Sequence, residues 1–216
     1  MRYVAVDTET TGLYKPFPIE LAAVYINNLE KTFCERIKLP FAVDIEPSAQ
    51  AVHGITKQCL SNCRSEQEVL TDFIKFVTDG DFCASTTTLV AHNAKFDKKV
   101  LDEAFIRNGF GEFINNFTWA CTMQISKSLA KQSNNIITKH KLSDCCERAN
   151  IPYEFGHSAL PDAIMCARVF TNFTNFVSSN TKDPQINEHR DQNMDLLITS
   201  DIMDKETNSF MNEIGF

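Results

Sequence analysis

Residues 4–13, VAVDTETTGL, place two carboxylates at the end of an apolar run. Side chains alternate between the two faces of a strand, so Asp7 and Glu9 are expected to point the same way, roughly 6–7 Å apart. Two like charges at this spacing repel each other unless a cation lies between them. Because hard divalent cations prefer carboxylate oxygens, a metal ion is the natural candidate for that cation.

The composition is that of an ordinary globular chain, with 216 residues and a hydrophobic fraction of 43%, enough for one well-buried core. Residues 1–3 enter a strand-like segment without the charged and apolar regions of a signal peptide, and no apolar run reaches transmembrane length. We therefore expect a cytoplasmic protein with no membrane partner. The eight cysteines form no C-x-x-C pair, which favours reduced thiols over zinc sites or disulfides.

The formal net charge of −7 alone would disfavour a nucleic-acid partner, but this charge is unevenly distributed. Residues 178–216 hold eight acidic and three basic side chains, whereas the remaining residues carry a net charge of only −2. We therefore expect one folded domain over residues 1–177 and an acidic, flexible C-terminal tail over residues 178–216.

Hydrophobic periodicity predicts a mixture of strands and helices. Strands are expected at residues 2–7, 19–27, 31–38, 89–91 and 118–121, with a hairpin turn at Asn27 and Asn28. Helices are expected after a capping box at residues 65–68, after Asn93 as N-cap, and over residues 122–130, 141–150 and about 159–177. Three strands followed by alternating helices and strands predict an α/β fold with a mixed sheet.

Three further stretches hold residues that complement the first acidic pair. LVAHNAKFD at 89–97 places Asp97 just inside a helix, and GHSALPDA at 156–163 places His157 in a loop and Asp162 in a first helical turn. SAQAVHGIT at 48–56 holds a His-Gly pair. Each stretch alone has an ordinary explanation, such as an acid that favours the helix dipole. An α/β sheet, however, would bring four acids and one histidine together at the ends of its elements.

These segments also occur together, in the same order, in a known family. DTETTGL at 7–13, HGIT at 53–56, AHNAKFD at 91–97 and the H-x4-D spacing of His157 and Asp162 resemble the motifs of the DEDDh 3′–5′ exonucleases, the family of the DNA polymerase III epsilon subunit and exonuclease X. The resemblance covers residues 1–177. It implies a ribonuclease H-like fold, a mixed β-sheet flanked by helices.

The resemblance implies phosphodiester hydrolysis with two ions of Mg²⁺ or Mn²⁺. It assigns Asp7, Glu9 and Asp162 to one ion, with Asp7 bridging towards a second ion held by Asp97. It assigns His157 as general base, a task that suits an ordinary imidazole at neutral pH. The residues that it places at the terminal nucleotide are Thr10, Leu13, Val52, His53, Asn93 and Phe96, although plain core packing is the alternative explanation for Val52 and Phe96.

The implied activity is a 3′–5′ exonuclease that releases nucleoside monophosphates from single-stranded or frayed DNA 3′ ends, in proofreading or repair. An RNA-trimming exoribonuclease remains open, because the same residues serve both substrates and discrimination depends on the sugar 2′ position. A non-catalytic subunit of a polymerase or clamp assembly is the third possibility. The tail segment from Gln192 to Leu197 is similar to peptides that bind the sliding clamp, or else belongs to a short amphipathic helix.

Overall fold

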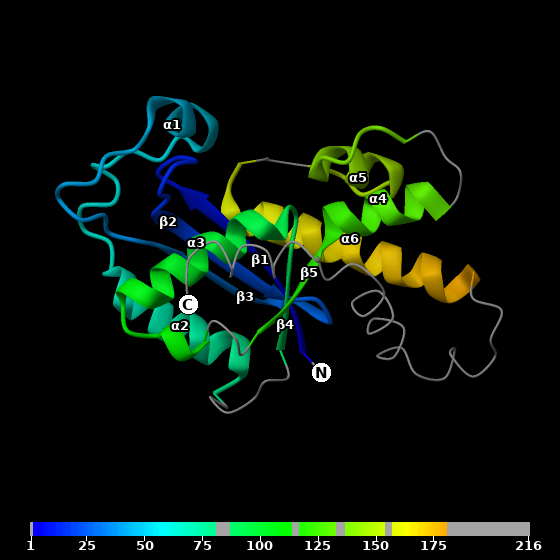
Figure 1. The fold of residues 1–216 in the computed structure, drawn as a ribbon, viewed down its shortest axis with the longest axis horizontal. Helices are drawn as coiled ribbons and strands as arrows, with labels where there is room; N and C mark the ends of the chain where they lie inside the picture. Colours follow the sequence, from blue (N-terminus) through cyan, green and yellow to red (C-terminus); the bar gives the residue numbers. More distant parts are fainter. Residues whose placement is uncertain (1, 81–86, 114–116, 133–136, 154–156, 181–216) are drawn as a thin grey trace, which may run out of the picture.

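The computed structural model describes residues 2–80, 87–113, 117–132, 137–153 and 157–180. A five-stranded sheet in the order β3-β2-β1-β4-β5 forms its centre (Figure 1). The strands are β1 (Arg2–Thr10), β2 (Pro18–Tyr25), β3 (Asn28–Arg36), β4 (Thr87–Ala91) and β5 (Thr118–Cys121). β1, β2 and β3 pair antiparallel, whereas β4 pairs parallel with β1 and β5 parallel with β4. The predicted mixed sheet is confirmed.

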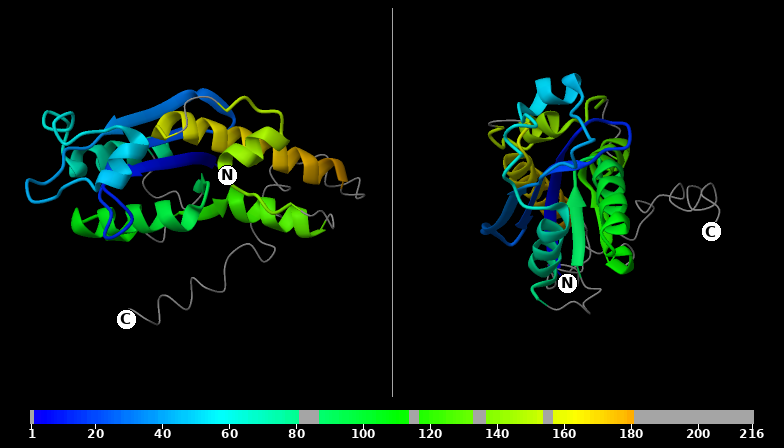
Figure 2. Two further views of the ribbon diagram at one scale, coloured as in Figure 1. Left: turned by 90° about the horizontal axis from the view of Figure 1, so that it is seen from above. Right: turned by 90° about the vertical axis from the view of Figure 1, so that its left-hand side faces the viewer.

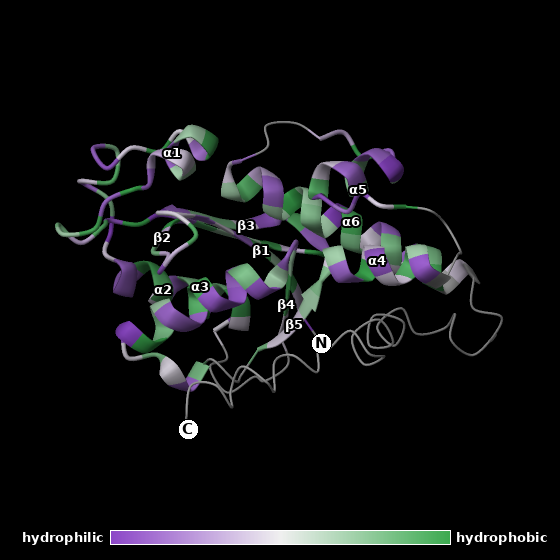
Figure 3. Cartoon of the chain, turned by 45° about the horizontal axis from the view of Figure 1, so that its top comes forward, coloured by the Kyte–Doolittle hydropathy of each residue, from purple (hydrophilic) through white to green (hydrophobic). Residues whose placement is uncertain are grey.

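Helices cover both faces of this sheet (Figure 2). They are α1 (Pro47–His53), α2 (Glu66–Thr78), α3 (Ala94–Arg107), α4 (Thr122–Gln132), α5 (Leu142–Arg148) and α6 (Ala159–Asn180), with a short 3-10 turn, η1 (Gly111–Phe113). Apolar residues of α4, α5 and α6 pack on one face, and those of α2 and α3 pack on the other. The long helices carry both hydrophobic and hydrophilic residues, as expected of helices with one face against a sheet (Figure 3).

The alternation of β1 decides which face receives each functional side chain. Tyr3 and Ala5 belong to the apolar cluster under α6, whereas Val4 and Val6 belong to the cluster under α2 and α3. Because side chains alternate along a strand, the odd-numbered acids that follow continue towards α6. The first acidic pair therefore lies on the α6 face, and the threonines between and after the two acids lie on the α3 face.

The structure corrects several predicted boundaries. β1 continues to Thr10 rather than ending at residue 7, because β2 supplies antiparallel partners as far as Pro18. The hairpin turn lies at Ile26 and Asn27, one residue before the predicted turn. α1 was not predicted because none of its seven residues is buried, so that it has no apolar face to reveal it.

The starts of α2 and α6 were predicted correctly. The capping box of Ser65 and Glu68 is present at the start of α2. α6 begins at Ala159 as predicted, with Pro161 in its first turn, and extends to Asn180. Most of the predicted tail, including the segment from Gln192 to Leu197, lies outside the described residues, so the domain division stays a prediction. Within the described ranges, no helix is both long and apolar enough to cross a membrane.

Candidate active site

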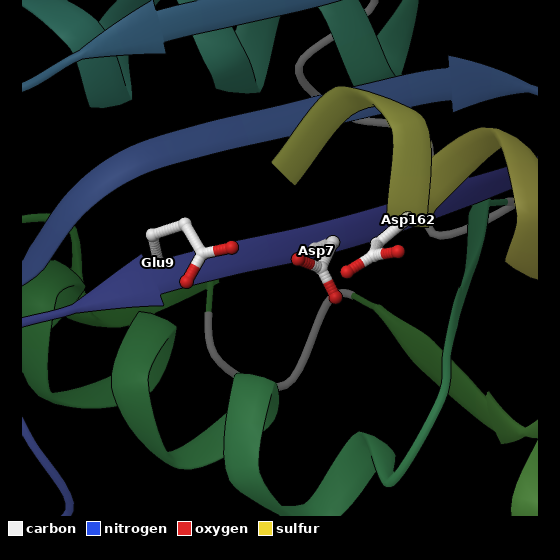
Figure 4. A group of neighbouring side chains, drawn as sticks. All are labelled: Asp7, Glu9 and Asp162. Atoms are coloured by element: carbon white, nitrogen blue, oxygen red, sulfur yellow. The ribbon is translucent and has the colours of Figure 1, made fainter. Parts of the chain in front are cut away.

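Three carboxylates converge where β1 passes the start of α6 (Figure 4). Asp7 and Glu9 come from β1, and Asp162 is the fourth residue of α6. One carboxylate oxygen from each lies within 4.8 Å of those of the other two. The structure therefore brings together the three acids that the family resemblance assigns to one metal ion.

The electrostatics of this cluster favour a bound cation. Burial, followed by the negative charges of Asp97 and Asp162, raises the pKa of Asp7 well above its ordinary value. Burial and the charges of Asp162 and Glu20 raise the pKa of Glu9 to about 7. A divalent cation would relieve this repulsion, and an all-oxygen donor set fits a hard ion such as Mg²⁺ or Mn²⁺. The residues present thus fit the implied metal.

The fourth acid, Asp97, is held separately. It is the fourth residue of α3 and is only 3% exposed. Its Oδ1 accepts hydrogen bonds from the backbone N–H of Thr8 at 3.1 Å and from the Thr8 hydroxyl at 2.8 Å. Burial raises the pKa of Asp97 to about 7, against the opposing effect of the Thr8 bonds. Asp97 lies near enough to raise the pKa of Asp7, but its part in a second metal site stays a prediction.

The predicted base, His157, lies two residues before α6. The backbone N–H of His157 donates to Asp162 Oδ2 at 3.0 Å, and the hydroxyl of Tyr153 donates to Asp162 Oδ1 at 3.3 Å. Burial raises the pKa of Asp162, and these two hydrogen bonds partly offset that rise. The side chain of His157 is exposed. The histidine is therefore anchored to the acidic cluster by its backbone, which leaves its imidazole at the solvent side.

His53 is fixed by two hydrogen bonds. Its Nδ1 accepts from the N–H of Ile55 at 3.0 Å, and its Nε2 lies 3.2 Å from the carbonyl oxygen of Thr10. Because Nδ1 accepts, Nε2 must carry the proton that it donates to Thr10. Burial lowers the pKa of His53, which favours this neutral form. His53 thus ties α1 to the end of β1, beside the acidic pair.

Two other predicted nucleotide contacts are large apolar side chains exposed to solvent. Leu13 is 79% exposed and Val52 is 53% exposed. Core packing is therefore the wrong explanation for Val52. Both residues lie close in sequence to the Thr10–His53 contact, so an apolar surface borders the end of β1.

The start of α3 holds the last two predicted contacts. Asn93 occupies the N-cap position, but its backbone is left-handed, with φ 64°, and its side chain makes no capping hydrogen bond. The predicted capping is therefore wrong, because an N-cap side chain reaches the helix N–H groups only from an extended backbone. Phe96 is partly buried, so both of its explanations remain open.

The sequence reasoning missed three residues of the site: Thr8, Tyr153 and Glu20. Glu20 is 5% exposed and lies directly opposite Glu9 in the pairing of β1 with β2. A signal for Glu20 was present, since it is the single charged residue of PIELAAVY, a strand that is otherwise apolar. Thr8 and Tyr153 carried no comparable signal.

Comparison with known proteins places this site in context. A family model described as Exonuclease matches residues 4–170. The DNA polymerase III PolC-type of Staphylococcus epidermidis is 31% identical over 198 residues, which cover 90% of this chain and 12% of that protein. The Staphylococcus aureus protein is 33% identical over 172 residues, or 78% of this chain and 11% of the relative. The chain thus spans only a small part of these polymerases.

Solved structures share the fold. Exonuclease I of E. coli in complex with a dA16 oligonucleotide superposes with a TM-score of 0.70 at 15% identity, covering 87% of this chain and 42% of the other. Exonuclease X in complex with 5′ overhanging duplex DNA gives a TM-score of 0.60 at 21% identity, covering 89% and 99%. These similarities agree with the ribonuclease H-like arrangement of a mixed sheet flanked by helices.

Proposed function

The chain belongs to the exonuclease family whose model spans residues 4–170, and on this premise we propose that it is a 3′–5′ exodeoxyribonuclease. It would hydrolyse the terminal phosphodiester bond at single-stranded or frayed DNA 3′ ends and release nucleoside monophosphates. The observation that carries this proposal is the convergence of Asp7, Glu9 and Asp162 within 4.8 Å, with the backbone of His157 bound to the last of these acids.

Mg²⁺ or Mn²⁺ is the proposed cofactor, as two ions. Asp7, Glu9 and Asp162 would hold one ion, and Asp97 with Asp7 the other. When bound, such ions polarise the phosphate and lower the pKa of a bound water. Burial and the charges of Asp162 and Glu20 raise the pKa of Glu9 to about 7, which supports the proposal that a cation binds here.

The protein's own residues would orient the substrate and move the proton. A ring nitrogen of His157 would accept the proton of the attacking water, as a general base does. The hydrogen bond from the His157 N–H to Asp162, 3.0 Å long, keeps that base beside the acids. Leu13 and Val52 offer exposed apolar surface to the terminal base, while Thr10, His53, Asn93 and Phe96 would complete the nucleotide pocket.

The choice of DNA over RNA rests on the relatives. The curated relatives are DNA polymerases, and exonuclease I and exonuclease X were solved with DNA. These names also favour a cytoplasmic role in replication or repair beside a polymerase. Contact with a sliding clamp through the segment from Gln192 to Leu197 remains a prediction, tested by clamp capture with the tail peptide and its loss in the Gln192→Ala, Leu196→Ala double variant.

The deciding experiment uses 5′-labelled single-stranded DNA and RNA of one sequence with Mg²⁺ or Mn²⁺. We expect a ladder that shortens from the 3′ end, forms faster on DNA, is absent with EDTA and forms at least about 100-fold more slowly in His157→Ala. A faster reaction on RNA would select the exoribonuclease alternative. Activity that persists in EDTA would contradict the metal-dependent mechanism, and an inactive protein with both ions would favour a non-catalytic subunit.

A further inference from the structure

A buried acid outside the metal cluster stands on the strand next to it. All eight residues of β2 are buried, and Glu20 is the single acidic residue among them. A buried carboxylate is unfavourable unless it is paired and hydrogen-bonded. Keeping one directly opposite Glu9, where it adds to the repulsion of the site, therefore calls for a specific role.

The contacts of Glu20 link three elements. Its Oε1 accepts from Arg36 Nε at 3.0 Å, and Arg36 is its register partner on β3. Its Oε2 accepts from the backbone N–H of Ala159 at 3.0 Å and lies 3.4 Å from the donating hydroxyl of Ser158. Each oxygen is thus occupied by a donor, and the carboxylate fastens the edge of the sheet to the beginning of α6.

This contact replaces the usual cap of a helix. Ala159 is the first residue of α6, and the first N–H groups of a helix have no acceptor within it. A side chain next to the helix usually supplies that acceptor. In α6 the acceptor is Glu20, which lies 139 positions earlier in the chain, on β2. The sheet therefore fixes the position of the first turn of α6.

The contacts of Glu20 stabilise the backbone at His157. This residue has φ 72°, in the left-handed region that residues other than glycine rarely adopt. Such a backbone persists only when its surroundings hold it on more than one side. Its own N–H is held by Asp162, and the two residues that follow are held by Glu20. Asp162 is also a proposed metal ligand. Of the two acids that hold the backbone around His157, Glu20 is therefore the one that serves only to position it.

We propose that Glu20, held by Arg36, is a positioning residue that fixes the backbone of His157 beside the three metal-binding acids. This inference rests on the proposed exonuclease function for its catalytic consequence. A role as a further metal ligand fits less well, because both oxygens of Glu20 are occupied and, among the described residues, the group able to hold a metal comprises Asp7, Glu9 and Asp162.

Kinetics of three variants test the proposal. Removing the anchor in Glu20→Ala should lower kcat by about 10- to 100-fold, up to the lower end of the roughly 10²- to 10⁴-fold that a general base contributes. KM and the affinity for Mn²⁺ should stay within about twofold, since neither the nucleotide pocket nor the metal ligands change. Glu20→Gln keeps an oxygen acceptor for Ala159 and should lose less activity. Glu30→Gln, an exposed acid of the same hairpin, should match the parent protein.

A double-mutant cycle separates positioning from general destabilisation. In the His157→Ala background, Glu20→Ala should change kcat by less than about twofold, because no base remains to be positioned. An additive loss in that background would overturn the proposal. So would a loss of Mn²⁺ affinity as large as that of Asp7→Asn, which would make Glu20 a ligand. If Glu20→Ala fails to fold, Arg36→Gln tests the same anchor at a side chain that is 48% exposed.

Amide hydrogen exchange of the metal-free protein gives a readout that needs no activity. The Ala159 amide should exchange at least about tenfold faster in Glu20→Ala than in the parent protein, because its acceptor is lost. Unchanged exchange would overturn the anchor whatever the activity. A parent protein without nuclease activity, but with a Glu20-dependent Ala159 amide, would refute the proposed function and leave the anchor standing.

Discussion

Two helices begin beside the active site, and their first turns are alike in outline. Each places an acid at its fourth residue, Asp97 in α3 and Asp162 in α6. A residue with a left-handed backbone precedes each helix: Asn93, φ 64°, directly before α3, and His157, φ 72°, two residues before α6. The two starts therefore deliver one carboxylate each towards the acids of β1.

The hydrogen bonds of the two acids differ. Asp97 binds the sheet directly, through both donors of Thr8, whereas Asp162 binds the N–H of His157 within its own helix start. Asp97 of α3 is thus held by a strand of the sheet. Asp162 of α6 is instead bonded to His157, the predicted base, so the positions of these two residues depend on each other. This difference explains why the α6 start needs a separate anchor and the α3 start does not.

The largest effects should come from removing the two acids. Asp97→Ala and Asp162→Ala should each lower kcat by about 10³-fold, equivalent to about 4 kcal/mol of lost transition-state stabilisation. Only Asp162→Ala should also speed amide exchange at His157, because only Asp162 accepts that N–H. Equal amide exchange at His157 in both variants would contradict the inferred difference between the first turns of α3 and α6.

Thr8→Val tests the anchor of α3. The change removes the hydroxyl donor to Asp97, and a hydrogen bond to a charged group contributes about 1.5–3 kcal/mol. We expect kcat to fall by about 10- to 100-fold while the exchange of the Ala159 amide is unchanged. Thr32→Val, at an exposed position of β3, serves as the control. A normal rate in Thr8→Val would mean that the backbone N–H of Thr8 holds Asp97 sufficiently.

Metal removal should make the stability of the protein depend on pH. The folded pKa values of Glu9 and Asp97, about 7, exceed those of unfolded chains, about 4. The folded state therefore binds more protons between pH 4 and pH 7, and the stability of the metal-free protein should fall as pH rises through that range. Urea unfolding in EDTA measures this fall, and Mg²⁺ should reverse it.

The Asp7→Asn variant tests the same charge repulsion in the metal-free protein. Removing one charge from the cluster should raise the free energy of unfolding of the metal-free protein at pH 8 by about 1 kcal/mol, a typical size for a single substitution. Glu30→Gln should have no such effect, because Glu30 is exposed. A destabilised Asp7→Asn would contradict the repulsion inferred at the site.

The smallest expected effect concerns the backbone before α3. Asn93→Gly should change the stability by no more than about 0.5 kcal/mol, because both residues tolerate the left-handed region. Asn93→Ala should cost about 1 kcal/mol, since alanine does not tolerate that region well. Thermal unfolding compares the two variants. Equal stability of all three proteins would show that the left-handed backbone of Asn93 is not maintained in solution.

Much of the fold was predictable because its signals are local. The alternation of β1 and the capping box of Ser65 act within a few residues of sequence. The same alternation predicts that Asp7 and Glu9 share a face. α1 could not be predicted because all of its residues are at least partly exposed. The full length of β1 could not be predicted because its last residues form a strand only through pairing with β2.

The sequence by itself determined the kinds of residue at the site, their order, and the helix and strand ends on which they lie. The tertiary structure decided which of them meet: it grouped Asp162 with the acids of β1 and fixed Asp97 on Thr8. It also gave Glu20 its partner 139 positions away in Ala159. The physical reason is range, since periodicity and capping act between neighbours, whereas hydrogen bonds between distant segments exist only after the sheet and helices have packed.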